Sequence, residues 1–273
     1  MHGATQVFNI LSYGGRAYRP FLNEISPCSG QSLLNDFFAN AAAKANAVGL
    51  EIVFGGFAEL AVLNTSQSAN WPPLIPLFNP QHATLHDGNA FCIFGVDRNG
   101  DIVATHAARL FDWRGTDFRT EATSLRLFYD CPDTAQLPGE ACIVSAPCAV
   151  QLTGNIVYSG AAWVRPDYRG LGLSSVFPRL GKVYADTLWR PDHIISLMTE
   201  PTYKKGLSSR TGYSRVEWAV DVSRSRIGSR RFALLSMQHA CAIKYASEFL
   251  GGAAPQINRA ILDGGTEQPV PIG

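Results

Sequence analysis

Residues 164–177, VRPDYRGLGLSSVF, join a strand-forming stretch to a helix-forming stretch through two closely spaced glycines. Residues 155–164, NIVYSGAAWV, are typical of a strand, and the apolar side chains of residues 174–189 recur at helical spacing. Glycines at such a joint let backbone N–H groups converge at the helix start, which carries about half a positive charge. The stretch predicts either an anion site or an ordinary, tightly packed connection.

Two common nucleotide-binding motifs do not fit this stretch. The chain contains no G-x-x-x-x-G-K-[ST], which excludes a P-loop. No third glycine follows Gly170 and Gly172 at the spacing of the dinucleotide fingerprint, which excludes a typical Rossmann turn. The stretch is therefore either an anion site of a different kind or an ordinary, tightly packed connection.

The stretch VRPDYRGLGLS resembles the acetyl-coenzyme A signature of the GNAT N-acetyltransferases, in which a strand leads into R/Q-x-x-G-x-G/A at a helix start. Arg169, Gly172 and Ser174 occupy the three signature positions, with Ser174 replacing the usual Gly or Ala. Farther on, Gly212 and Tyr213 resemble the family's Gly-aromatic pair that enters another strand. The resemblance covers about residues 88–222.

The resemblance implies an α/β fold with a mixed, mainly antiparallel sheet flanked by helices. It also implies direct transfer of an acetyl group from acetyl-CoA, without a metal, to an amine of a small molecule or peptide. The strand edge 162–164 would bind the pantetheine arm and the amides of residues 169–175 the pyrophosphate. The implied coenzyme-binding residues are Ala162, Trp163, Val164, Arg169, Gly170, Leu171, Gly172, Leu173, Ser174 and Ser175.

The catalytic groups that the family usually carries are missing from their expected positions. Gly160 stands near the position at which the family often carries a carboxylate. Ser208 stands at the position at which the family usually carries a tyrosine that acts as the acid. Tyr203 is a substitute acid or an aromatic packed at a strand end, and Glu200 is a base or a solvated carboxylate at a helix start. His106 is a second candidate base, although a polar side chain on an exposed face of a hairpin is the simpler interpretation.

These departures leave a second function open. A non-catalytic acyl-CoA-binding sensor or interaction module could keep the coenzyme site and lack the acid and base. Gly160 and Ser208 favour this alternative, whereas the signature itself is compatible with both. The acceptor has no recognisable sequence pattern.

The composition of the chain indicates which binding partners and which cellular compartment to expect. The 273 residues contain 23 Lys and Arg against 22 Asp and Glu, so no basic field for nucleic acid is expected. The chain shows neither a targeting segment nor an apolar window of membrane-spanning length, which predicts a cytoplasmic protein without a membrane partner. Six cysteines without metal-ligand spacing predict buried thiols and no metal site. A homodimer is left open.

We expect three segments along the chain. Residues 1–87 form a helical and loop extension packed on the core, and residues 88–222 form the acyl-CoA-binding core with an inserted segment, 111–155. Residues 223–273 form a C-terminal helix and tail. Within these segments the pattern predicts helices over 32–48, 117–130 and 229–251, a hairpin over 91–110, strands over 193–198 and 215–222, an irregular stretch over 131–148 and a proline-rich connector or lid over 64–90.

Overall fold

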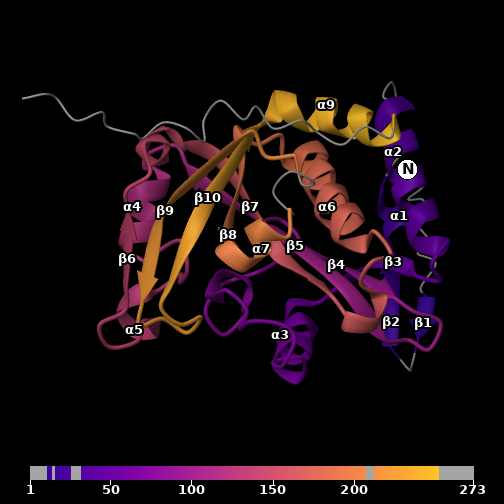
Figure 1. Cartoon of the computed structure of the whole chain (residues 1–273), viewed down its shortest axis with the longest axis horizontal. Coiled ribbons are helices and arrows are strands. Elements are labelled where there is room, and N and C mark those ends of the chain that lie inside the picture. Colours follow the sequence, from indigo (N-terminus) through magenta and orange to yellow (C-terminus); the bar gives the residue numbers. More distant parts are fainter. Residues whose placement is uncertain (1–10, 14–15, 26–31, 207–211, 252–273) are drawn as a thin grey trace, which may run out of the picture.

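The strands of the chain form one mixed sheet with helices on both faces (Figure 1). The computed structural model describes residues 11–13, 16–25, 32–206 and 212–251, and within these residues the strand order is β1-β2-β3-β4-β5-β7-β8-β10-β9-β6. The strands are β1 (Leu11–Tyr13), β2 (Arg16–Pro20), β3 (Glu51–Gly55), β4 (Ala90–Val96), β5 (Ile102–Trp113), β6 (Ala141–Val144), β7 (Gly154–Val164), β8 (His193–Thr199), β9 (Arg215–Ser223) and β10 (Arg230–Gln238).

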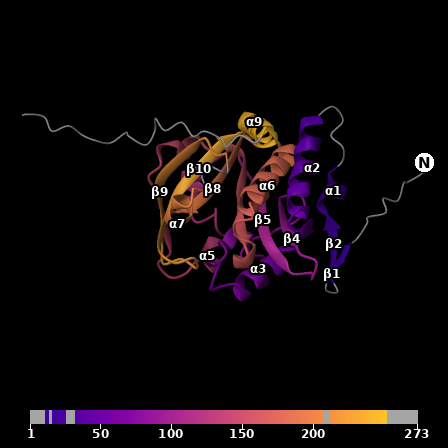
Figure 2. The same ribbon diagram turned by 45° about the vertical axis from the view of Figure 1, so that its right-hand side comes forward.

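Three long helices, α2, α6 and α9, lie on one face of the sheet, and shorter elements cover the other (Figures 1 and 2). Because both faces of the central strands are covered, their apolar side chains divide between two separate core clusters. The helices are α1 (Phe21–Glu24), α2 (Ser32–Asn46), α3 (Phe57–Ser66), α4 (Phe118–Thr123), α5 (Pro132–Ala135), α6 (Leu173–Trp189), α7 (Glu200–Lys204) and α9 (His239–Leu250), with short 3-10 turns at Pro76–Phe78, Pro147–Gln151 and Pro166–Tyr168.

One pair of strands positions the site. Among the described residues, every strand pairing is antiparallel except that of β7 with β8, which is parallel and covers only 156–158 against 193–195. Beyond this point β7 continues to Val164 and β8 to Thr199 without pairing to each other. The register of β7 with β5 also shifts there, beside Ala161, whose φ of 51° is unusual for a residue with a side chain. We call the opening between residues 159–164 and 196–199 the wedge.

The predicted fold class is confirmed. The sheet is mixed and mainly antiparallel, helices flank it, and the predicted hairpin over 91–110 is the β4–β5 pair. The sheet also extends beyond the predicted core, because β3 pairs with β4 and β10 lies between β8 and β9. In the sheet, β3 and β4 therefore lie on the β7 side of the wedge, and β10 and β9 lie on its β8 side.

Several predicted elements are wrong. The predicted helix over 229–251 is a helix only from His239, because residues 230–238 form β10, whose apolar run is buried on both sheet faces. The predicted helix over 117–130 ends at Thr123, and Leu125 follows with a φ of 63°. The stretch over 131–148 contains α5 and the edge strand β6.

The prediction that the cysteines are buried also needs correction. Cys131 is exposed, although Cys92, Cys142 and Cys148 are buried free thiols. Within the described part of the chain, no helix combines the length and apolar character needed to cross a membrane.

Candidate functional site

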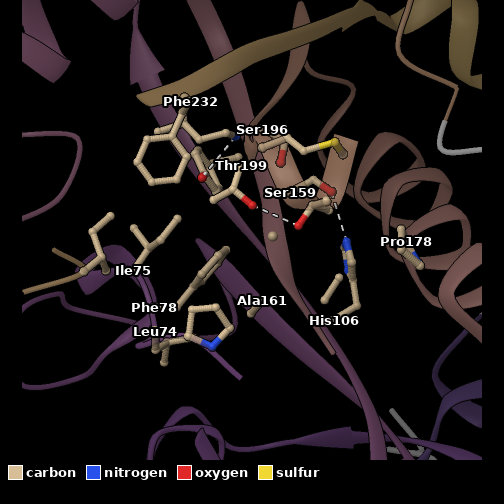
Figure 3. Close-up of a pocket in the computed structure, with 18 of the residues that line it drawn as sticks. Leu74, Ile75, Phe78, His106, Ser159, Ala161, Pro178, Ser196, Thr199 and Phe232 are labelled. Atoms are coloured by element: carbon tan, nitrogen blue, oxygen red, sulfur yellow. Dashed lines mark hydrogen bonds between the residues drawn. The ribbon is translucent and has the colours of Figure 1, made fainter. Parts of the chain in front are cut away.

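The wedge contains a cavity in two adjoining parts. The inner pocket, of about 210 Å³, lies between β7, β8 and the proline-rich segment, and Figure 3 shows its lining. The outer pocket, of about 740 Å³, lies between the end of β7, the start of α6 and α7. The two parts share lining residues, among them Ala162, Pro178 and Thr199, and therefore adjoin.

The residues on either side of the glycine turn, Arg169, Leu173 and Ser174, line the outer pocket. Gly170 and Gly172 have φ values of 86° and 81°, a backbone conformation that favours glycine. A Cβ atom at either position would meet no other atom within 4 Å, so close packing does not explain these glycines. The amides of residues 170–174 donate to no backbone carbonyl within the described residues. The turn therefore presents free N–H donors at the positive end of α6.

Most charged side chains of the outer pocket are basic. Among the described residues, Arg169, Lys205, Arg230 and Arg231 line it together with a single carboxylate, Glu200. Arg169 is held beside β7, because its Nε donates to the carbonyl oxygen of Val164 at 3.1 Å. The outer pocket thus has the charge and the donors that an anionic ligand requires.

Apolar side chains from the proline-rich segment wall the inner pocket. Trp71 stacks on Trp163 with ring centroids 5.1 Å apart and an interplanar angle of 10°. Phe78 contributes a second flat wall, and Phe232 of β10 lies near it (Figure 3). Residues 64–90 were predicted to be a connector or lid, and this segment does cover the wedge.

Packing explains why Gly160 carries no carboxylate. A Cβ atom at Gly160 would lie 2.9 Å from side-chain atoms of both Phe78 and Tyr158. Any side chain there would displace a wall of the inner pocket. This part of β7 therefore cannot hold the base that the family resemblance implied.

A buried polar network lines the other side of the inner pocket. His106 Nε2 and Ser159 Oγ are 3.0 Å apart, and Ser159 and Ser196 both act on the pKa of the Tyr213 hydroxyl. All four residues line the inner pocket. The network lies at the base of the wedge, where a group reaching through the outer pocket would end.

The prediction that His106 is exposed on a hairpin face is wrong. Its side chain is buried beneath α6, and Gly181 makes this possible because a Cβ there would overlap the imidazole. Burial, with a smaller contribution from Lys182, lowers the pKa of His106 to about 3. The imidazole is therefore neutral at pH 7 and is a weak base.

The same burial shifts the pKa values of Lys182 and Tyr213 in the direction that favours their uncharged forms. The Lys182 Nζ lies 4.1 Å from the Tyr213 ring centroid and has no hydrogen-bond partner within the described residues. Burial is the main cause that lowers the pKa of Lys182 well below its usual value and raises that of Tyr213 to about 12. The Tyr213 hydroxyl therefore remains protonated at neutral pH.

Of the residues predicted to act in catalysis, His106 belongs to this network, whereas Glu200 and Tyr203 do not. Glu200 lines the outer pocket and forms an ion pair of 2.6 Å with Lys204, which lowers the pKa of Glu200. Tyr203 lines neither pocket and packs edge-on against Trp218, with centroids 5.3 Å apart. Ser208 lies outside the described residues.

Most of the predicted coenzyme-binding residues meet at the outer pocket. Leu171 instead is 47% exposed, and the Ser175 amide is engaged with the Gly172 carbonyl oxygen at 2.9 Å. The predicted residues that line the outer pocket are Ala162, Trp163, Val164, Arg169, Leu173 and Ser174. Within the described part of the chain, no group of three His, Cys, Asp or Glu side chains could hold a metal ion.

The buried state of His106 predicts a pH-dependent stability. Because the imidazole has a pKa of about 3 when folded and about 6.5 when unfolded, the unfolded chain binds the proton first. Stability conferred by neutral His106 is present above pH 6.5 and is lost as the pH falls toward 3. Between pH 6.5 and 5, we expect the wild type to lose about 1.5 kcal/mol more unfolding free energy than His106→Asn. Urea unfolding at both pH values measures this difference, and equal losses would contradict the buried, neutral state.

Comparisons with known proteins give distant structural likenesses. No family model and no curated protein matches the sequence. A mutant of the spermidine N-acetyltransferase SpeG from Vibrio cholerae is 8% identical, with a TM-score of 0.42 over 72% of this chain and 97% of that chain. NAA60 of Arabidopsis thaliana, in complex with a bisubstrate analogue, is 12% identical, with a TM-score of 0.43 over 68% and 97%. The ribosomal-protein-S5-alanine acetyltransferase of Vibrio fischeri is 12% identical, with a TM-score of 0.42 over 70% and 93%.

Proposed function

We propose that this chain is an acyl-CoA-dependent N-acyltransferase of the GNAT type that transfers an acetyl group to an amine. One observation carries the proposal: the cavity runs from a basic helix start, along the edge of β7 that has no β8 partner, to a small inner pocket with buried hydroxyl groups. A coenzyme with phosphates at one end and a thioester at the other fits this sequence of environments.

The two parts of the cavity have distinct roles in this proposal. The amides of residues 170–174 and Arg169 bind the pyrophosphate, because both supply donors to phosphate oxygens. The edge of β7 from Ala162 to Val164 has no β8 partner, so that the amides of the pantetheine arm can pair with it beside the contact of Arg169 with the Val164 carbonyl oxygen. The thioester then lies in the inner pocket, whose small volume suits a short acyl group.

The Tyr213 hydroxyl is the group we assign to the departing sulfur. It is protonated at neutral pH, lines the inner pocket and interacts with Ser159 and Ser196. As the C–S bond breaks, this hydroxyl donates a hydrogen bond to the developing thiolate and stabilises it. His106 orients Ser159 through the 3.0 Å contact and remains neutral.

Acetyl-CoA binding and CoA release together test the proposal. At a concentration 100 times its dissociation constant, a ligand of the folded state adds about 2.7 kcal/mol of stability, which corresponds to roughly 5 °C in Tm. We expect such a shift with acetyl-CoA, and release of free CoA when an acceptor amine is added.

A shift without CoA release from any amine would favour a non-catalytic acyl-CoA-binding module. The inner pocket gives that alternative some support, because no described residue that lines it is a carboxylate. The absence of any shift would contradict both functions.

A further inference from the structure

The inner pocket is poor in charge for a site that receives an amine. Among the described residues that line it, Arg230 is the single charged side chain, and none is a carboxylate. His106 is neutral at pH 7. The nearest carboxylate of the cavity, Glu200, lines the outer pocket and is already paired with Lys204.

An alkylammonium ion would therefore be destabilised in this pocket. Moving a cation from water into an apolar space is costly unless an anion accompanies it, and Arg230 adds repulsion at the mouth. Such an amine would also need a base to remove its extra proton before attack. Gly160 cannot accommodate one, and a histidine with a pKa of about 3 is too weak.

We propose that the acceptor is an aromatic amine, with the nitrogen bonded directly to a single ring; this inference rests on the proposed function. The nitrogen lone pair of such an amine is delocalised into its ring, so that the amine is neutral at pH 7 and needs neither a counterion nor a base. The walls match the ring: Phe78, Tyr158 and Phe232 offer aromatic surfaces. A volume of about 210 Å³ is below the roughly 300–1,000 Å³ of sites for drug-sized ligands and suits one ring beside a short acyl group.

The reaction balances without an added base. The amine nitrogen forms a bond to the thioester carbon, the C–S bond breaks, and the proton released from nitrogen passes to the sulfur. The products are an N-aryl amide and free CoA. The chain supplies apolar walls for the ring and a hydroxyl, that of Tyr213, for the sulfur.

Two isomeric amines provide the test. 4-Methylaniline and benzylamine have the same atoms, but benzylamine is an ammonium ion at pH 7. With acetyl-CoA as donor, we expect kcat/KM for 4-methylaniline to exceed that for benzylamine at least tenfold at pH 7, after subtraction of the uncatalysed rates. As the pH rises from 6.5 to 8, the ratio of kcat/KM for 4-methylaniline to kcat/KM for benzylamine should fall. The neutral fraction of benzylamine increases over this range, whereas 4-methylaniline is already neutral. In the presence of CoA, 4-methylaniline should also raise Tm more than benzylamine does.

A substitution in the wall should change this preference. Ile75 is half-buried and lines the inner pocket from the proline-rich segment (Figure 3). Ile75→Glu adds the missing carboxylate, and Ile75→Gln adds the same bulk without charge. We expect Ile75→Glu alone to raise the benzylamine to 4-methylaniline ratio at least tenfold relative to the wild type.

The outcomes separate the inference from the proposed function. Faster acylation of benzylamine or spermidine than of 4-methylaniline would overturn the aromatic acceptor and leave the acyltransferase intact. CoA release with none of the amines, despite a thermal shift with acetyl-CoA, would overturn both the enzyme and its acceptor. An equal change in the ratio for Ile75→Glu and Ile75→Gln would show that the pocket charge does not set the preference, and would also overturn the inference.

Discussion

Replacing Ala162 by tryptophan is expected to abolish stabilisation by acetyl-CoA and to lower CoA release more than 100-fold. Ala162 is exposed and lines both the inner and the outer pocket, so its Cβ points into the cavity where they join. An indole at this position fills the passage that the pantetheine arm needs. Since the added ring occupies open space rather than the core, we expect the fold to be retained.

Thermal unfolding with and without acetyl-CoA measures this effect. The control is Ala39→Trp, the same substitution at an exposed position of α2, which lies in neither pocket. The control should keep a shift of roughly 5 °C, as expected for a ligand at 100 times its dissociation constant. An Ala162→Trp protein with an unchanged shift would place the coenzyme outside the wedge.

The features that could be predicted from the sequence are those that local chemistry determines. The glycine turn was recognisable because a backbone with φ near 80° favours glycine, and both Gly170 and Gly172 adopt it. The β4–β5 hairpin was recognisable because two strand-forming runs flank a short turn containing Asn99 and Gly100. In each case neighbouring residues alone specify the backbone.

The features that were missed depend on contacts between distant parts of the chain. The apolar run in residues 230–238 does not by itself distinguish a helix from a strand. These residues form a strand because they pair with β8 on one side and with β9 on the other. The sequence also cannot show that Phe78 fills the space beside Gly160, which explains the missing carboxylate. His106 looked exposed because nothing near it in the sequence indicates that α6 covers it at Gly181.

The role of Tyr213 in the buried polar network also could not be predicted from the sequence. Tyr213 was noted as half of a Gly-aromatic pair that enters a strand, but its interactions with Ser159 and Ser196 require that β7 and β8 lie side by side. A search of the sequence for a tyrosine at the family's usual spacing leads to Ser208 or Tyr203 instead. Contacts between segments that are distant in the sequence determine where the Tyr213 hydroxyl lies in the wedge.

Tyr213→Phe is therefore expected to lower kcat about 100-fold while changing KM for acetyl-CoA less than threefold. The substitution keeps the ring that packs against Lys182 and removes only the hydroxyl, so binding persists and stabilisation of the departing thiolate is lost. Losing the polar interactions of the hydroxyl should cost about 1 kcal/mol of unfolding free energy, too little to unfold the domain.

Steady-state kinetics with acetyl-CoA and 4-methylaniline measure the effect, and Tyr168→Phe is the matched control. The Tyr168 hydroxyl donates to Asp97 at 3.2 Å and lines neither pocket, so its loss should leave kcat unchanged. Because the pKa of Tyr213 is about 12, its hydroxyl stays protonated from pH 6 to 9, and the deficit of Tyr213→Phe should be constant across that range. A Tyr213→Phe enzyme with wild-type kcat would remove the phenol from the mechanism and leave the sulfur to be protonated by the amine alone.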